Sequence, residues 1–104
     1  MTLEMLNALA EPNRLHIIEL LKERSYSVND LVGLLRIRQP QASKHLQTLH
    51  RAGLVDVQAV AQQRIYTLNP EAFFQLEQWT HSFNSLWNNR LDNLDSHLKT
   101  IKKE

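Results

Sequence analysis

The chain has 104 residues, of which 42% are hydrophobic, and a formal net charge of +1. This length suits one domain, over residues 1–104, with a modest core that pairing with a second copy would enlarge. The absence of cysteine excludes disulfides, thiolate metal ligands and thiol redox sensing. Because the first residues lack a signal-peptide pattern and no stretch approaches the ~20 apolar residues of a membrane span, we expect a cytoplasmic protein with no membrane partner.

Two helices are predicted first, since only two glycines and three prolines interrupt the chain. Leu3 and Leu6 recur at helical spacing and indicate a short N-terminal helix. A second helix begins near Pro12, whose missing N–H suits a first helical turn. Leu15 and Ile18 belong to the wide apolar face of this second helix.

A third and a fourth helix follow, separated by a short turn. Ser27 is a good N-cap for a helix over residues 28–35, and Asp30 can return a hydrogen bond in the manner of a capping box. After the turn, the fourth helix opens at Gln39–Pro40 and closes at Gly53. Proline in the first turn and glycine just past the end are typical of a bounded helix.

The fourth helix has two faces of different character. Its apolar stripe consists of Ala42, Leu46 and Leu49. Its other face is polar and carries Gln41, Ser43, Lys44, Gln47, Thr48 and Arg51. The window from Leu31 to Val55 holds arginine and lysine but no acidic residue, so the middle of the chain is basic although the net charge is small. Chance clustering of surface charge is the alternative explanation.

After Gly53 the pattern changes from helical to strand-like. Residues 54–60 and 64–68 are rich in β-branched and aromatic residues and predict two strands, joined by a polar tip at Ala61–Gln63. The tip lacks the Asn-Gly or Asp-Gly signal of a tight turn. From Pro70 onward, apolar residues recur every three or four positions, which predicts one amphipathic helix of roughly 30 residues, about 45 Å long.

This order of elements predicts the fold class. Two helices, a short helix, a turn, a polar-faced helix and a β-hairpin are the organisation of a winged helix-turn-helix, in which the hairpin is the wing. We therefore expect a mainly α fold with a small β-hairpin and a long C-terminal dimerisation helix. The major groove of B-DNA is about 12 Å wide and admits one α-helix, so the polar helix suits a DNA duplex.

Three stretches, in this order, carry a resemblance to a known family. Residues 39–55, QPQASKHLQTLHRAGLV, resemble the signature of ArsR/SmtB-type bacterial repressors, while residues 8–15 resemble the family's opening and residues 63–68 its wing strand. The similarity covers about residues 3–101. It implies a homodimer whose first and last helices form the interface, and repression at an operator near the protein's own promoter. The C-terminal part is similar to a branch of the family without a recognised metal site.

Contacts to double-stranded DNA are predicted for the turn, the polar helix and the wing: Arg36, Arg38, Gln39, Gln41, Ser43, Lys44, His45, Thr48, Gln62, Gln63 and Arg64. Glutamine can pair with adenine in the major groove, and lysine can reach guanine or a phosphate. A merely solvated polar face is the plain alternative. His45 can instead be a packed helix residue, and Arg38 can cap the preceding turn. Arg64 can enter the minor groove, bind a phosphate or remain idle on the surface.

Apolar side chains at both ends of the chain are predicted to form the dimer interface: Leu3, Leu6, Phe83, Trp87, Leu91, Leu94 and Leu98. Phe73 shares their stripe and is expected in the core or the dimer seam. Trp79 lies off the main stripe, where it can line a ligand pocket.

Metal binding and catalysis are not expected. Asp95 and His97 lack a second pair of ligands, and Glu77 with His81 supplies only two of the four that a closed zinc site needs. The residues that stand where thiolate-sensing relatives carry cysteines are Ser25, Ser27 and Asn29. Because the sequence has no nucleophile–base pair, glycine-rich phosphate loop or paired-carboxylate motif, we expect neither an enzyme nor a cofactor.

The sequence thus predicts a homodimeric repressor that binds an inverted-repeat operator. Two alternatives stay open: a metal- or ligand-responsive sensor, and a protein-interaction module that keeps the scaffold without binding DNA. The low net charge favours the module. The polar face from Gln39 to Arg51, which is free of acidic residues, argues against it. The identity of any small-molecule effector does not follow from the sequence.

Overall fold

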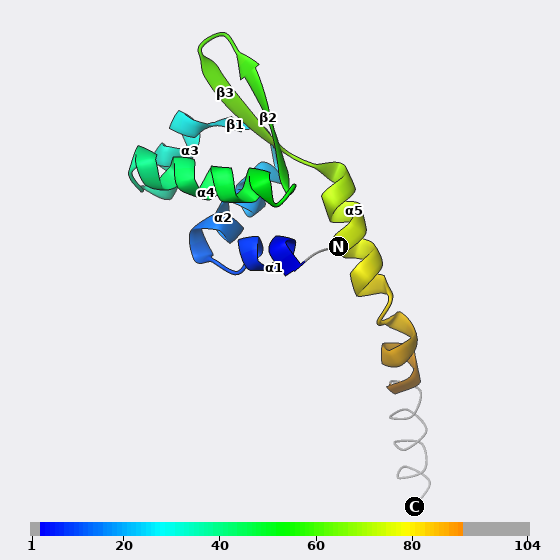
Figure 1. Cartoon of the computed structure of the whole chain (residues 1–104). Coiled ribbons are helices and arrows are strands. Elements are labelled where there is room, and N and C mark those ends of the chain that lie inside the picture. The colour runs from blue at the N-terminus through cyan, green and yellow to red at the C-terminus, as the bar shows by residue number, and fades with distance from the viewer. Residues whose placement is uncertain (1–2, 91–104) are drawn as a thin grey trace, which may run out of the picture. The chain divides into compact units, whose positions relative to one another are not determined.

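The computed structural model describes residues 3–90. The chain divides into two compact units, Met1–Phe73 and Phe74–Glu104, and a single domain spanning both stays a prediction of the sequence. The elements are α1 (Leu3–Leu9), α2 (Pro12–Leu21), β1 (Tyr26–Ser27), α3 (Val28–Leu35), α4 (Gln39–Arg51), β2 (Val55–Val60), β3 (Gln63–Leu68) and α5 (Pro70–His81) (Figure 1). Within residues 3–90, every helix is too short or too polar to cross a membrane.

A polar clamp joins α1 to α2. Glu11 precedes α2, and its carboxylate accepts the backbone N–H of Arg14 at 2.8 Å, which satisfies one of the free donors at the start of the helix. The Arg14 guanidinium donates to the carbonyl of Ala8 at 2.6 Å and to that of Asn7 at 3.4 Å, near the end of α1. A cation is favoured at this end by the helix dipole. Pro12 occupies the first turn of α2, as predicted.

The core of the first unit is built from one apolar face of each helix and from the inner side of the sheet. Its largest fully buried side chains are Ile17, Leu31, Leu46, Leu49, Leu54 and Val55. Burying a side chain of this size contributes about 1.5–3 kcal/mol. The predicted apolar stripe of α4 is confirmed, because Ala42, Leu46 and Leu49 are all 0% exposed.

Local hydrogen bonds fix the start and the end of α3. The Ser27 hydroxyl accepts the N–H of Asp30 at 3.1 Å, and the Asp30 carboxylate accepts the N–H of Ser27 at 3.1 Å, so the predicted capping box is confirmed. At the other end Arg36 adopts a left-handed backbone conformation, with φ 57° and ψ 43°, and donates its N–H to the carbonyl of Val32. This residue turns the chain toward α4.

The end of α4 is closed by a glycine, as predicted. Gly53 has φ +83°, and its N–H donates to the carbonyl of His50 at 3.0 Å. The N–H of Leu54 donates to the carbonyl of Leu49, also at 3.0 Å. The two bonds form a Schellman motif, which directs the chain out of the helix and into β2.

The sheet is antiparallel, with strand order β1-β3-β2. β2 and β3 form the predicted hairpin, but its tip is one residue shorter than predicted. Val60 pairs with Gln63, so Gln63 belongs to β3 and the connection consists of Ala61 and Gln62. Ala61 adopts a positive φ of 56° there, a conformation that tight hairpin turns more often give to glycine or asparagine. The sequence did not predict β1, which exists because Tyr26 pairs with Tyr66.

Residues 70–90 are largely helical, as expected, but with one interruption that the sequence pattern did not predict. α5 ends at His81, residues 82–83 form a turn, and residues 84–90 are helical again. The Ser82 hydroxyl donates to the carbonyl of Trp79, and the Thr80 hydroxyl donates to that of Leu76. Such back-bonding competes with the helical ladder and bends helices. The single helix of roughly 30 residues is therefore corrected to two helical segments within the described residues.

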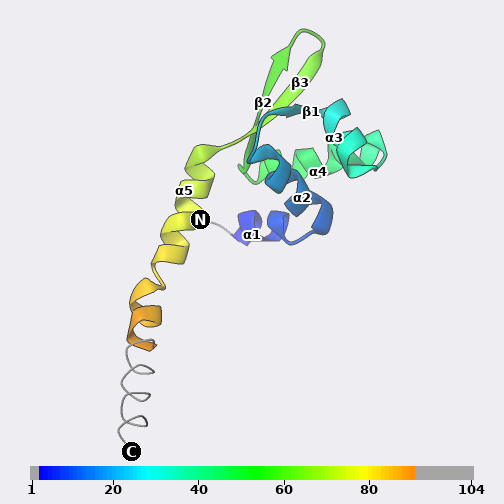
Figure 2. The same ribbon diagram turned by 180° about the vertical axis from the view of Figure 1, so that it is seen from behind.

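The first unit has the arrangement of a winged helix-turn-helix. α3, the turn at residues 36–38 and α4 form the helix-turn-helix, and the β2–β3 hairpin extends beyond the helices (Figures 1 and 2). The fold class predicted from the sequence is confirmed.

Candidate nucleic-acid interface

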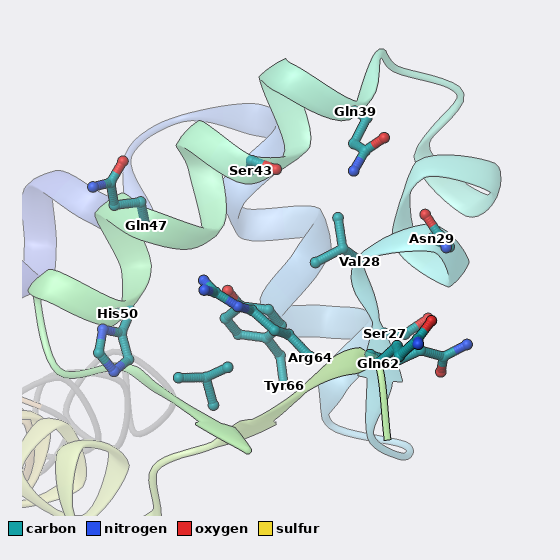
Figure 3. A pocket seen from close by; sticks show the side chains of 12 residues that line it. Ser27, Val28, Asn29, Gln39, Ser43, Gln47, His50, Gln62, Arg64 and Tyr66 are labelled. Carbon is teal, nitrogen blue, oxygen red and sulfur yellow. The ribbon is translucent and has the colours of Figure 1, made fainter. Parts of the chain in front are cut away.

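An open groove of about 670 Å³ lies between α4 and the hairpin (Figure 3). Its lining comes from the start of α3, from one face of α4 and from the wing. The residues are Ser27, Val28, Asn29, Gln39, Ser43, Gln47, His50, Val57, Gln62, Gln63, Arg64 and Tyr66. The helix-turn-helix and the wing therefore share one concave surface.

The α4 wall of this groove follows from helical geometry. Gln39, Ser43 and Gln47 are four residues apart, and His50 follows three residues later. At about 100° per residue, these four positions fall within an arc of roughly 80° on the helix surface. The buried leucines of α4 lie on a different arc, so burial of the apolar stripe turns this polar row toward the wing.

The groove carries hydrogen-bonding groups and positive charge. None of the described residues that line the groove is Asp or Glu, and Arg64 supplies a permanent positive charge. Within residues 3–90, the side chains of Ser43, Gln47 and Arg64 make no internal hydrogen bond or ion pair, so their donors face solvent. Such a surface suits a polyanion that also accepts hydrogen bonds.

The predicted DNA contacts divide into groups by position. Those that line the groove are Gln39, Ser43, Gln62, Gln63 and Arg64. Arg36 and Arg38 lie exposed on the turn before α4, and Lys44 is exposed on α4 outside the groove lining. Arg36 and Arg38 thus lie just before the start of α4, where the helix dipole also favours an anion, and Lys44 adds a positive charge further along the helix.

Three predicted contacts on α4 have partners within the protein. The Gln41 side chain accepts the N–H of Arg38 at 3.3 Å and so caps the helix, and the Thr48 hydroxyl donates to the carbonyl of Lys44. His45 Nδ1 lies 3.6 Å from the Glu11 carboxylate, and its side chain is 18% exposed. For His45, this position favours the prediction of a packed helix residue over that of a phosphate contact.

Of the groove residues on α4, two were absent from the predicted contact set, Gln47 and His50. Both are exposed, and both share the groove-facing arc of α4 with Ser43. Their spacing from Ser43, four and seven residues, is the signal that could have identified them.

Large apolar side chains are exposed in both units. Leu3 in α1 is 72% exposed, and Leu6 is half-buried. In the second unit, Phe83 and Trp87 are exposed and line a small hollow of about 160 Å³ together with Leu86 and Arg90. Leu91, Leu94 and Leu98, also predicted to form the dimer interface, lie outside the described residues.

Trp79 packs against an aromatic residue four positions later in the chain. Its ring contacts that of Phe83 edge-on, with the centroids 5.3 Å apart and the planes at 86°. Aromatic pairs favour this geometry. Asp95 and His97 lie outside the described residues, and within residues 3–90 no three His, Cys, Asp or Glu side chains gather into a metal site.

A polar helix and a wing that share one groove define the class of winged helix-turn-helix proteins. The sequence model described as "Bacterial regulatory protein, arsR family" matches residues 11–57. Solved structures match most of the chain, among them HlyU from Vibrio cholerae, with 33% identity, TM-score 0.64, and coverage of 77% of this chain and 88% of that one. Another, described as a possible transcriptional regulator for arsenical resistance, is also 33% identical, with TM-score 0.70 and coverage of 79% of this chain and 85% of that one. The chain belongs to the arsR family of bacterial regulatory proteins.

Two further relatives have informative descriptions. The HTH-type transcriptional repressor SmtB of Mycobacterium tuberculosis is 38% identical over 65 residues, which cover 62% of this chain and 48% of SmtB. The chain thus spans about half the length of this curated relative. The other is the homodimeric winged helix-turn-helix DNA-binding domain of a possible ArsR-family transcriptional regulator from Mycobacterium bovis. It is 25% identical, with TM-score 0.65 and 78% of each chain covered.

Proposed function

We propose that this protein is a transcriptional regulator that binds duplex DNA in a sequence-specific manner, as a homodimeric repressor on an inverted-repeat operator. The observation that carries the proposal is the groove between α4 and the wing, which has hydrogen-bonding walls, a free arginine and no carboxylate among the described residues. The proposed place of action is the chromosome in the cytoplasm.

The helix that would enter the major groove is α4. It is supported from beneath by buried leucines, and it presents Gln39, Ser43 and Lys44 on exposed faces. Amides and cations of this kind read base edges and hold phosphates. Arg36 and Arg38, on the turn before α4, would bind phosphates of the flanking backbone.

Dimer formation is supported by the apolar side chains that each unit exposes. Leu3 is 72% exposed and Trp87 is 59% exposed, and a second copy would remove such surface from water. Trp87→Glu should therefore yield a monomer in sedimentation experiments. Leu34→Glu is the matched control, because Leu34 is also exposed but lies on α3, outside the predicted interface. An unchanged dimer in the Trp87 variant would remove Trp87 from the interface.

The decisive experiment is selection of bound fragments from random duplex DNA. A two-fold symmetric dimer places its two α4 helices in successive major grooves, about 34 Å apart. The expected result is an inverted repeat with half-sites one helical turn, or a multiple of it, apart. Failure to enrich any sequence would favour a protein-interaction module on the same scaffold.

Activation is the second candidate function, because HlyU of Vibrio cholerae, 38% identical over 65 residues, is described as a transcriptional activator. A reporter gene behind the selected operator distinguishes the two. We expect lower expression when the protein is present, and a rise would assign activation instead.

A further inference from the structure

The two walls of the groove differ in how they can bind DNA. The α4 wall offers neutral and weakly basic donors from Ser43, Gln47 and His50, whereas the wing offers the arginine Arg64 (Figure 3). Both sets of side chains border the same space, so a ligand in the groove must contact both sets with the same part of its structure.

The register of the wing sets Arg64 back from its tip. The tip consists of Ala61 and Gln62, whereas Arg64 is the second residue of β3 and pairs with Ala59. Its side chain extends into the space between the hairpin and α4 (Figure 3). Of the two DNA contacts open to this arginine, this position favours a phosphate over the floor of the minor groove.

The geometry of B-DNA identifies what lies in such a space. A helix in the major groove is bordered on each side by a sugar–phosphate strand, and the minor groove lies beyond that strand. If α4 occupies the major groove, a wing beside it must lie across the neighbouring strand. Side chains between the two then face phosphates, and base edges are reached only from the surfaces of α4 that point into the major groove.

We propose that the groove between α4 and the wing holds one sugar–phosphate strand of the duplex, with Gln47, His50 and Arg64 as positioning residues on its phosphates. This assignment rests on the proposed function and adds to it that these three residues contact the sugar–phosphate backbone of the DNA. The absence of carboxylates from the described lining is consistent with this ligand, because an acidic side chain there would repel it.

The test compares variants on two duplexes of equal length, the selected operator and an unrelated sequence, over a series of salt concentrations. Gln47→Ala should weaken binding to both by the same factor, about 2- to 10-fold for a lost neutral hydrogen bond. It should leave the salt dependence unchanged, because no charge is removed. Arg64→Ala should weaken both and reduce the slope of log K against log salt by about 0.9 per subunit.

Gln58→Ala is the matched control, because Gln58 is exposed on β2 but does not line the groove. It should bind both duplexes like the wild type. A loss by Gln47→Ala on the operator alone would assign Gln47 to base reading and overturn the proposal. Wild-type affinity of both the Gln47 and the Arg64 variants would also overturn it.

A second measurement identifies the phosphates directly. Replacing operator phosphates by neutral methylphosphonates in symmetry-related pairs, one in each half-site, should reveal one pair of positions at which the penalty for Arg64→Ala disappears. Additive penalties at every position would contradict the proposal. Failure of the wild type to bind either duplex is a different result, because it would overturn the proposed function itself.

Discussion

The chain contains two glycines, and their backbone conformations predict opposite effects for the same substitution. Gly33 lies inside α3 with an ordinary helical conformation, whereas Gly53 follows α4 with φ +83°. A methyl group built on either residue meets no heavy atom within 4 Å, so neither substitution creates a clash. The difference between the two variants therefore isolates backbone conformation.

The expected magnitudes follow from that conformation. An L-residue in the left-handed region costs roughly 1–2 kcal/mol, so Gly53→Ala should be destabilising by about that amount. Alanine inside a helix is more stable than glycine by roughly 0.5–1 kcal/mol, so Gly33→Ala should be stabilising. At about 4–8 °C per kcal/mol for a domain of this size, the melting temperature should fall by about 4–16 °C in the first variant and rise by about 2–8 °C in the second.

The assay is thermal unfolding followed by circular dichroism. All proteins are compared at one concentration, because the melting temperature of a dimer depends on concentration. An unchanged or raised melting temperature in the Gly53 variant would refute the assignment of Gly53 to a left-handed helix terminus.

Three further predictions concern single side chains. Ser27→Ala removes the N-cap of α3 and should lower the free energy of unfolding in urea by about 1 kcal/mol, whereas Ser25→Ala, at an exposed site without a cap, should leave it unchanged. Arg36→Gly relieves a positive φ and should not lower the melting temperature, but should weaken DNA binding and reduce its salt slope by about 0.9 per subunit; a clear fall in stability would count against the turn geometry. Lys44→Ala and Arg64→Ala should each weaken operator binding in a gel-shift titration at unchanged melting temperature, and wild-type affinity in both would remove them from the interface.

Helix ends could be predicted because short-range hydrogen bonds determine them. Ser27 and Asp30 are three residues apart and cap α3 as expected. Gly53 ends α4 because glycine accepts a positive φ at little cost. The buried stripe of α4 follows from a period of 3.6 residues. For these features, the sequence contains all the interacting groups within a few positions.

The features that could not be predicted depend on groups distant in sequence or on competing local bonds. β1 exists only because Tyr26 meets Tyr66 across the folded unit. The orientation of His45 depends on Glu11, whose own position is fixed by the clamp between α1 and α2. The Gln41 amide could pair with a DNA base, but it caps its own helix instead. The break after His81 reflects hydroxyl–carbonyl bonds that hydrophobic periodicity does not detect.

Two residues of the interface were found only in the structure, for a geometric reason. The sequence identified α4 and the wing separately, but their mutual position decides which polar side chains face the groove. Gln47 and His50 were therefore left out, although both lie on the arc of Gln39 and Ser43. The position of the wing determines which exposed face of α4 lines the groove.

The salt dependence of affinity for the selected operator is the sharpest test of whether this protein binds the DNA backbone. We assign phosphate contacts to Arg36, Arg38, Lys44 and Arg64 in each of two subunits. Eight such contacts, at about 0.9 each, predict a slope of log K against log salt of about −7. A slope close to zero would contradict the claim that α4, its preceding turn and the wing bind the backbone of a DNA duplex.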